Sequence, residues 1–209
     1  AVIKKLLQRE DATDFAVLAA EASLGSSEMQ LYAARELEGT NRRDEAEKYY
    51  SGVLELDKGN LVALTNLGSF FSGRGEYSKL IELYTNAIEN DGVDHVVVQI
   101  NLLNAFNLAA RYEECLQWSE KFLQKNNEPS IMSARLEALT KLKRFTQVEE
   151  LIKPKSENKL ISPSEEYYLA LALSLQGCNL KERKTCNTKE KQACCEKDIQ
   201  ALGIFEKLY

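Results

Sequence analysis

The sequence predicts an all-helical protein in which antiparallel helical hairpins stack one on another, an arrangement called an α-solenoid. Two observations carry this prediction. Apolar and small residues recur with a period of about 34 residues along the chain. Within each period they form two stripes at spacings of three and four, the spacing of one helix face, and a turn separates the two stripes. Because one hairpin cannot bury its apolar face alone, successive hairpins are expected to pack together.

The clearest repeat runs over residues 61–94. Its first predicted helix has a face of apolar and small residues, formed by Leu64, Leu67, Gly68 and Phe71. Its second predicted helix has a similar face, formed by Leu80, Leu83, Tyr84 and Ala87. Gly73 and Gly75 mark the turn between the helices, and Gly92 marks the end of the second.

The same pattern extends to both sides of this repeat. Residues 27–60 match it without any insertion, residues 96–128 match it after one extra residue, and residues 129–154 match it more loosely. The matching positions in residues 27–60 are Ala33, Ala34, Leu37, Ala46, Tyr50 and Val53. Residues 1–24 resemble part of an earlier repeat, so we expect the chain to be a fragment or a trimmed product.

A final repeat is predicted over residues 163–209. Ser162 can cap its first helix and Pro163 suits the first helical position. The partner helix is recognisable only at Ala201, Phe205 and Leu208, so the turn between the two helices is longer than in the other repeats. The extra residues form an insert at 178–197.

The repeat at residues 61–94 resembles the tetratricopeptide repeat (TPR) family, whose two helices touch through small residues. Gly68 and, in the preceding repeat, Ala46 occupy such places, whereas Leu80 and Cys115 depart from the usual alanine. The resemblance implies a right-handed superhelix that forms one domain over residues 1–209. It also implies a protein that binds another protein or a peptide in a concave groove lined by the first helix of each hairpin.

The groove residues that the resemblance implies are Tyr32, Arg35, Asn66, Ser69, Asn101, Asn104 and Asn107. Asparagine both donates and accepts hydrogen bonds, so a row of asparagines can pair with the backbone of an extended peptide. The alternative is that exposed asparagines on these helices bond only to water, as polar helix faces usually do.

The insert at 178–197 is locally basic in a chain whose net charge is −5. Its candidate docking residues for an acidic partner are Lys181, Arg183, Lys184, Lys189 and Lys191. Insertions in repeat arrays often bind partners, but a run of charges is more commonly a solvated loop. Both interpretations stay open on the sequence.

Four of the five cysteines lie in the insert, at Cys178, Cys186, Cys194 and Cys195. None of their spacings is that of a structural zinc site, so we predict no metal and no cofactor. A disulfide between Cys178 and Cys194 or Cys195 stays open. Cys115 lies outside the insert and is expected to be a small buried core residue.

Composition and motifs argue against an enzyme. His95 is the only histidine, and no glycine-rich phosphate-binding loop occurs.

No apolar run is long enough to cross a membrane, and a pI near 5.2 argues against nucleic-acid binding except within a larger complex. The odd number of cysteines and the absence of a glycosylation sequon favour a cytoplasmic protein.

The sequence therefore predicts a non-catalytic adaptor or scaffold that binds a partner polypeptide in its groove. A first alternative is a constitutive subunit of a larger complex that makes contacts through its end faces and its basic insert. A second is a cysteine-based metal-binding or redox-responsive module. A third is a regulatory domain cut from an enzyme.

Overall fold

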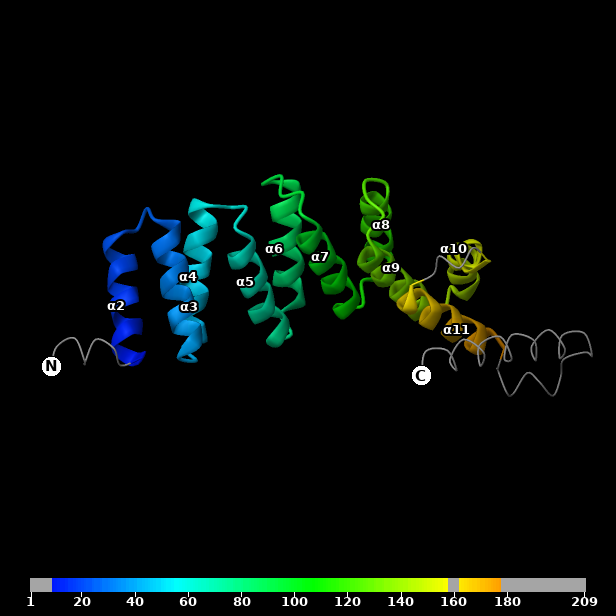
Figure 1. Ribbon diagram of the computed structural model, residues 1–209, viewed down its shortest axis with the longest axis horizontal. Coiled ribbons are helices and arrows are strands. Elements are labelled where there is room, and N and C mark those ends of the chain that lie inside the picture. The colour runs from blue at the N-terminus through cyan, green and yellow to red at the C-terminus, as the bar shows by residue number, and fades with distance from the viewer. Residues whose placement is uncertain (1–8, 158–161, 178–209) are drawn as a thin grey trace, which may run out of the picture. The chain divides into compact units, whose positions relative to one another are not determined.

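The computed structural model describes residues 9–157 and 162–177, and within these ranges every regular element is an α-helix. Figure 1 shows the helices following one another as antiparallel hairpins, which confirms the predicted fold class. The described helices are α2 (Arg9–Ala22), α3 (Ser27–Gly39), α4 (Arg43–Leu56), α5 (Leu61–Gly73), α6 (Tyr77–Glu89), α7 (Val96–Leu108), α8 (Tyr112–Leu123), α9 (Pro129–Lys141), α10 (Phe145–Glu157) and α11 (Pro163–Gly177).

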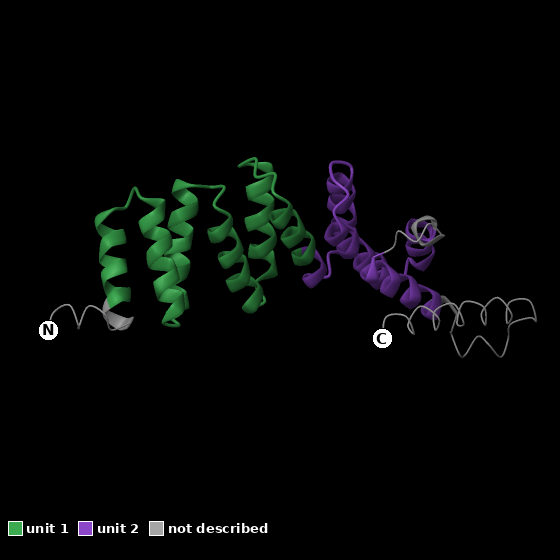
Figure 2. Ribbon diagram, in the orientation of Figure 1, with its two compact units in different colours: residues 1–105 green, residues 106–209 purple. Residues whose placement is uncertain are grey.

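The chain divides into two compact units, residues 1–105 and residues 106–209 (Figure 2). The boundary falls near the end of α7, and we describe each unit by itself. The predicted repeat boundaries and the single domain over 1–209 stay predictions.

Side-chain caps fix several helix starts. The Ser26 hydroxyl accepts a hydrogen bond from the backbone N–H of Met29 at 3.3 Å, and Asn60 Oδ1 accepts one from Ala63 at 3.1 Å. Before α11, Ser162 Oγ accepts from the Glu165 N–H at 3.3 Å, and the Glu165 carboxylate accepts from the Ser162 N–H at 2.9 Å. This reciprocal capping box confirms the helix start predicted at Ser162.

The hairpin turns share one backbone feature. In four hairpins, the residue two places before the second helix has a positive φ angle. These residues are Asn41 (φ 63), Gly75 (φ 70), Ala110 (φ 56) and Lys143 (φ 58). Only glycine, and to a lesser degree asparagine, adopts this left-handed conformation without strain.

The core of the first unit lies between the helices of successive hairpins. Its main cluster joins α3, α4 and α5 and contains Leu37, Ala46, Tyr50, Leu67 and Phe70. A second cluster joins α2 to α3 through Ala16, Ala20 and Ala33, which have no exposed surface. Burying one large apolar side chain contributes about 1.5–3 kcal/mol before the loss of conformational entropy, so these clusters hold the stack together.

The helices α5 and α6 approach each other closely at Gly68. A Cβ atom added to Gly68 would lie 1.8 Å from Tyr84 Oη and 2.6 Å from Tyr84 Cζ. The Tyr84 ring therefore occupies the space that any other residue at position 68 would need. This contact explains in physical terms the small residue that the repeat pattern requires at this position.

Most of the buried side chains described in the second unit come from α8, α9, α10 and α11. Side chains that are almost wholly buried come from all four helices, and they are Cys115, Phe122, Ile131, Leu136, Leu139, Val148, Ile152, Ala170 and Ala172. The Cys115 thiol donates a hydrogen bond to the Ala134 carbonyl at 3.7 Å. Cys115 is thus the buried core residue that the sequence predicted.

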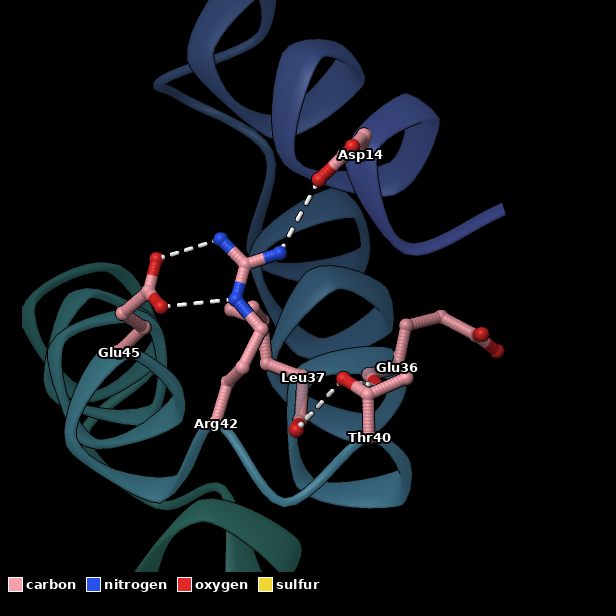
Figure 3. Close-up of polar contacts among 6 residues, drawn as sticks. All are labelled: Asp14, Glu36, Leu37, Thr40, Arg42 and Glu45. Carbon is pink, nitrogen blue, oxygen red and sulfur yellow. Dashed lines mark hydrogen bonds and ion pairs between the residues drawn. The ribbon is translucent and has the colours of Figure 1, made fainter. Parts of the chain in front are cut away.

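Arginines at the hairpin turns join neighbouring hairpins. In Figure 3, the Arg42 guanidinium reaches Glu45 of α4 through two hydrogen bonds of 2.7 Å and Asp14 of α2 through one of 3.0 Å. Arg74 pairs in the same way with Asp44 and Glu47 of α4 at 2.6 and 2.5 Å. Such partly exposed pairs fix the register of one hairpin on the next more than they stabilise the fold.

We expect Gly68→Ala to lower the free energy of unfolding by about 1–3 kcal/mol, because the new methyl group overlaps the Tyr84 hydroxyl and forces the ring to move. Urea denaturation followed by circular dichroism measures this change. Gly73→Ala is the matched control in the same helix, since a Cβ atom there meets nothing within 4 Å. Equal effects of the two substitutions would contradict the close approach.

We expect Ala110→Gly to raise the free energy of unfolding by up to about 1 kcal/mol, because glycine relieves the left-handed strain at this position. Thermal unfolding measures the gain. Ala109→Gly is the control at the adjacent position, which has no positive φ, and it should only destabilise. A loss of stability in both variants would show that the turn at Ala110 is not strained.

Candidate peptide-binding face

The first unit carries six of the seven groove residues that the TPR resemblance implies. They lie on the first helices of three successive hairpins: Tyr32 and Arg35 on α3, Asn66 and Ser69 on α5, and Asn101 and Asn104 on α7. Tyr32 is 44% exposed, and Arg35, Ser69 and Asn104 are also exposed, whereas Asn66 and Asn101 are half-buried. The face is therefore accessible to a partner, and two of its asparagines, Asn66 and Asn101, are partly buried in it. We call these six residues the asparagine face.

A buried tyrosine lies beneath Asn66. Tyr50 of α4 has no exposed surface, and its hydroxyl donates a hydrogen bond to Glu38 Oε2 of α3 at 2.9 Å. Burial, and then the Glu38 carboxylate, raise the pKa of Tyr50 well above its usual value, while a hydrogen bond with the Asn66 side chain acts in the opposite direction. The phenol is thus a neutral group that joins α4 to α3, and it lies beside Asn66 of α5.

The same arrangement recurs one repeat further along the chain. Tyr84 of α6 is 3% exposed, and burial raises its pKa to about 12, while a hydrogen bond with Asn101 of α7 acts in the opposite direction. The ring reaches this place because Gly68 leaves room for it. Asn66 and Asn101 therefore occupy equivalent sites, each beside the tyrosine of the preceding second helix. The repeat pattern indicated both tyrosines only as core residues.

A small cleft opens beside Ser69. It has a volume of about 150 Å³ and is lined by Glu38 of α3, Arg43 at the start of α4, Ser69, Phe70 and Gly73 of α5, and Arg74. Arg74 is held there by its ion pairs with Asp44 and Glu47. Residues of α3 and α5 adjoin in this cleft. It offers a ligand the carboxylate of Glu38 and the guanidinium groups of Arg43 and Arg74.

The two remaining asparagines have different surroundings. Asn104 is exposed, and within the described residues its side chain has no hydrogen-bond partner, so its donor and acceptor are both available. Asn107 belongs to the second unit, where its Nδ2 donates to the Ala134 carbonyl at 3.0 Å and to Glu137 Oε2 at 3.2 Å. Because its amide nitrogen already joins α7 to α9, Asn107 is a weaker candidate for binding a peptide than the sequence suggested.

The other candidate sites of the sequence analysis fall largely outside the described residues. These are the docking residues Lys181, Arg183, Lys184, Lys189 and Lys191, and the cysteines Cys178, Cys186, Cys194 and Cys195. In residues 9–157 and 162–177, no group of three or more His, Cys, Asp and Glu side chains is placed to hold a metal ion. Among the same residues, no helix is both long and apolar enough to cross a membrane.

Comparison with known proteins agrees with this architecture. A tetratricopeptide repeat family model matches residues 63–92, which include Gly68 and Tyr84. A solved structure with the same fold is YrrB, described as a TPR protein with an unusual peptide-binding site. It superposes with a TM-score of 0.61 at 14% sequence identity, over 90% of this chain and 91% of the other. No curated protein sequence matches the chain.

The stacked hairpins and the accessible face of their first helices define a helical-repeat protein. Residues 63–92 match a tetratricopeptide repeat, and the predicted resemblance to the TPR family is thus confirmed. Proteins with this repeat typically bind other proteins or peptides and are usually not catalytic.

The pH dependence of stability tests the burial of Cys115. Burial is the main cause that raises the pKa of its thiol to about 12, with the charge of Glu137 adding to it. An unfolded thiol loses its proton above about pH 8.5, while the folded one keeps it, so rising pH favours the unfolded state. The contribution of the Cys115 thiol to the free energy of unfolding is fully present below about pH 8.5 and is lost as the pH approaches 12.

We therefore expect the free energy of unfolding to fall more steeply with pH in the native sequence than in Cys115→Ala, by at most about 1.4 kcal/mol per pH unit. Urea denaturation at intervals between pH 8 and pH 10 gives the two slopes. The cysteines of the insert are present in both proteins and cancel in the difference. Identical slopes would mean that the Cys115 thiol is not protected from ionisation.

Proposed function

We propose that this protein is a non-catalytic interaction module that binds an extended segment of a partner polypeptide along the asparagine face. Asn66, Asn101 and Asn104 are the proposed contacts to the partner backbone. Tyr32, Arg35 and Ser69 lie on the same first helices and would contact partner side chains. The protein would act as an adaptor or a scaffold subunit within a larger assembly.

The observation that carries this proposal is the repeated tyrosine–asparagine contact. Asn66 and Asn101 are half-buried polar side chains on an otherwise accessible face, and each lies beside a buried tyrosine. Partial burial restricts the rotamers of these amides, so they lose less conformational entropy when a ligand binds, and this preorganisation adds to affinity.

Amide groups suit backbone recognition because each offers both a donor and an acceptor. A peptide in an extended conformation presents its N–H and C=O groups at regular intervals, and these groups are the same for every sequence. Asparagines at equivalent repeat positions can meet these groups without selecting side chains. Selection would then fall to the neighbouring Tyr32 and Arg35.

An affinity pull-down from cell extract tests the proposal. We expect Asn66→Ala/Asn101→Ala/Asn104→Ala to reduce capture of the bound protein by about tenfold or more, because each lost hydrogen bond costs about 0.5–1.5 kcal/mol. Asn104→Ala alone is the variant that leaves the core untouched, and we expect a smaller loss from it. Circular dichroism and thermal unfolding establish that the variants remain folded.

The matched control is Asn86→Ala/Asn90→Ala on and next to the second helix α6. These asparagines are exposed, and within the described residues their side chains bond to one another, with Asn90 Nδ2 donating to Asn86 Oδ1 at 2.9 Å, so the substitutions should not change capture. Full capture by the triple variant would refute the asparagine face. Loss of capture in a chain lacking residues 179–193 would instead assign binding to the insert.

A second candidate function is contact through an end face of the helical array. It is favoured by the exposure of two large apolar side chains on α2, Phe15 at 58% and Leu18 at 63%. Loss of capture in Phe15→Ser/Leu18→Ser, with the triple asparagine variant unaffected, would support this function over the first.

A further inference from the structure

The second unit contains a larger cleft that neither the asparagine face nor the insert accounts for. Its volume is about 690 Å³, in the range of protein sites that take a ligand. It lies among the first helices α9 and α11 and the start of the second helix α10. The lining residues are Glu137, Thr140, Lys141, Lys143, Phe145, Tyr167, Tyr168, Leu171 and Leu175.

The floor of this cleft is apolar and partly open to solvent. Leu175 is 49% exposed and Tyr167 is 42% exposed, although both are large hydrophobic residues. The Tyr167 ring stands edge-on to the Tyr168 ring with 5.3 Å between their centroids, which gives the floor a rigid aromatic part. Exposed apolar side chains that gather in a hollow, rather than singly, are typical of an interaction site.

The charged residues of the cleft differ in whether they can pair with a ligand. Lys141 and Lys143 are exposed, and within the described part of the chain neither ammonium group has an acidic partner. The carboxylate of Glu137 instead accepts a hydrogen bond from Asn107 Nδ2 at 3.2 Å. Lys143 also has the positive φ angle of the hairpin turn, so its backbone is fixed by the fold. The cleft thus offers two free positive charges beside an apolar floor.

We propose that this cleft binds an acidic peptide segment that carries large apolar side chains. The apolar side chains would cover Leu171, Leu175 and Tyr167, and carboxylates next to them would pair with Lys141 and Lys143. Tyr168 adds a neutral hydroxyl, since burial raises its pKa to about 12 and the charge of Glu137 acts in the same direction.

The charge pattern of the whole chain favours this occupant over nucleic acid. The net charge is −5, and a nucleic-acid site needs an extended basic surface rather than two lysines. The site is also independent of the asparagine face, because every lining residue belongs to the second unit. The two sites can therefore be tested separately in the full chain.

The test is fluorescence anisotropy with the full chain and a labelled octapeptide. In this peptide, pairs of acidic residues (Asp and Glu) alternate with apolar residues (Leu and Phe). We expect binding that Lys141→Glu/Lys143→Glu weakens by roughly tenfold or more, because two attractive charge pairs become repulsive. Leu175→Ser removes half-exposed apolar surface and should weaken binding by roughly threefold to tenfold without unfolding α11. Asn66→Ala/Asn101→Ala/Asn104→Ala should leave the affinity unchanged.

Three controls test whether binding depends on the position of the two lysines and on the composition of the peptide. Lys48→Glu/Lys153→Glu makes the same change in net charge with exposed lysines outside the cleft, and it should bind the peptide normally. A peptide with Lys in place of its acidic residues, and another with Ser in place of Leu and Phe, should each bind at least about tenfold more weakly.

Several results would overturn the proposal. One is the absence of binding. Another is that the Lys141→Glu/Lys143→Glu variant binds the acidic peptide as tightly as the native chain does. A third is that the native chain binds the basic peptide as tightly as the acidic one. Binding that appears only after residues 198–209 are removed would show that the chain's own end fills the cleft. A dimer in sedimentation experiments that the two lysine substitutions dissociate would assign the cleft to a second copy of the chain.

Discussion

The contact on which the first unit depends is the approach of the Tyr84 hydroxyl to the backbone at Gly68. It brings α5 and α6 so close that no side chain fits between them, and it places the phenol where Asn101 of the next helix can reach it. One tyrosine thus closes its own hairpin and joins the following one. Tyr50 has the equivalent role one repeat earlier, with Glu38 as an additional partner. Packing and the candidate binding surface are therefore parts of one arrangement, because the tyrosines that pack between the helices also lie beside the amides of Asn66 and Asn101.

A second set of contacts acts at the hairpin turns. Arg42 and Arg74 each reach back from a turn to acidic residues of the preceding second helix, and Arg144 reaches Glu113 in the same way in the second unit. These pairs are partly exposed and screened by salt, so they add little to stability. They are directional, however, whereas the apolar contacts between neighbouring helices are not. The apolar core holds successive hairpins together, and the arginines select one register for them.

The period and helix faces of this chain were readable from the sequence because they depend on residue type at fixed spacing. Gly68, Ala46 and the capping box at Ser162 are examples, and each has the role expected of it. Features that depend on three-dimensional geometry were not readable. Nothing in the identity of Ala110 or Lys143 indicates a left-handed backbone, whereas Gly75 and, to a lesser degree, Asn41 in the equivalent turns are residue types that favour it. Asn107 matched a groove position, yet its amide bonds to Ala134, since the direction of a side chain is set by the neighbouring helix rather than by spacing.

The two candidate surfaces differ in what they can recognise. Neutral amides on the asparagine face meet backbone groups that all peptides share, so they favour an extended conformation over a particular sequence. The cleft of the second unit has the opposite properties, because its lysines and apolar floor respond to the composition of a ligand. Long-range charge attraction speeds encounter and is weakened by salt, whereas amide contacts form at short range and are little affected by it. A chain with both surfaces can thus separate selection of a partner from retention of that partner, with a different physical interaction responsible for each.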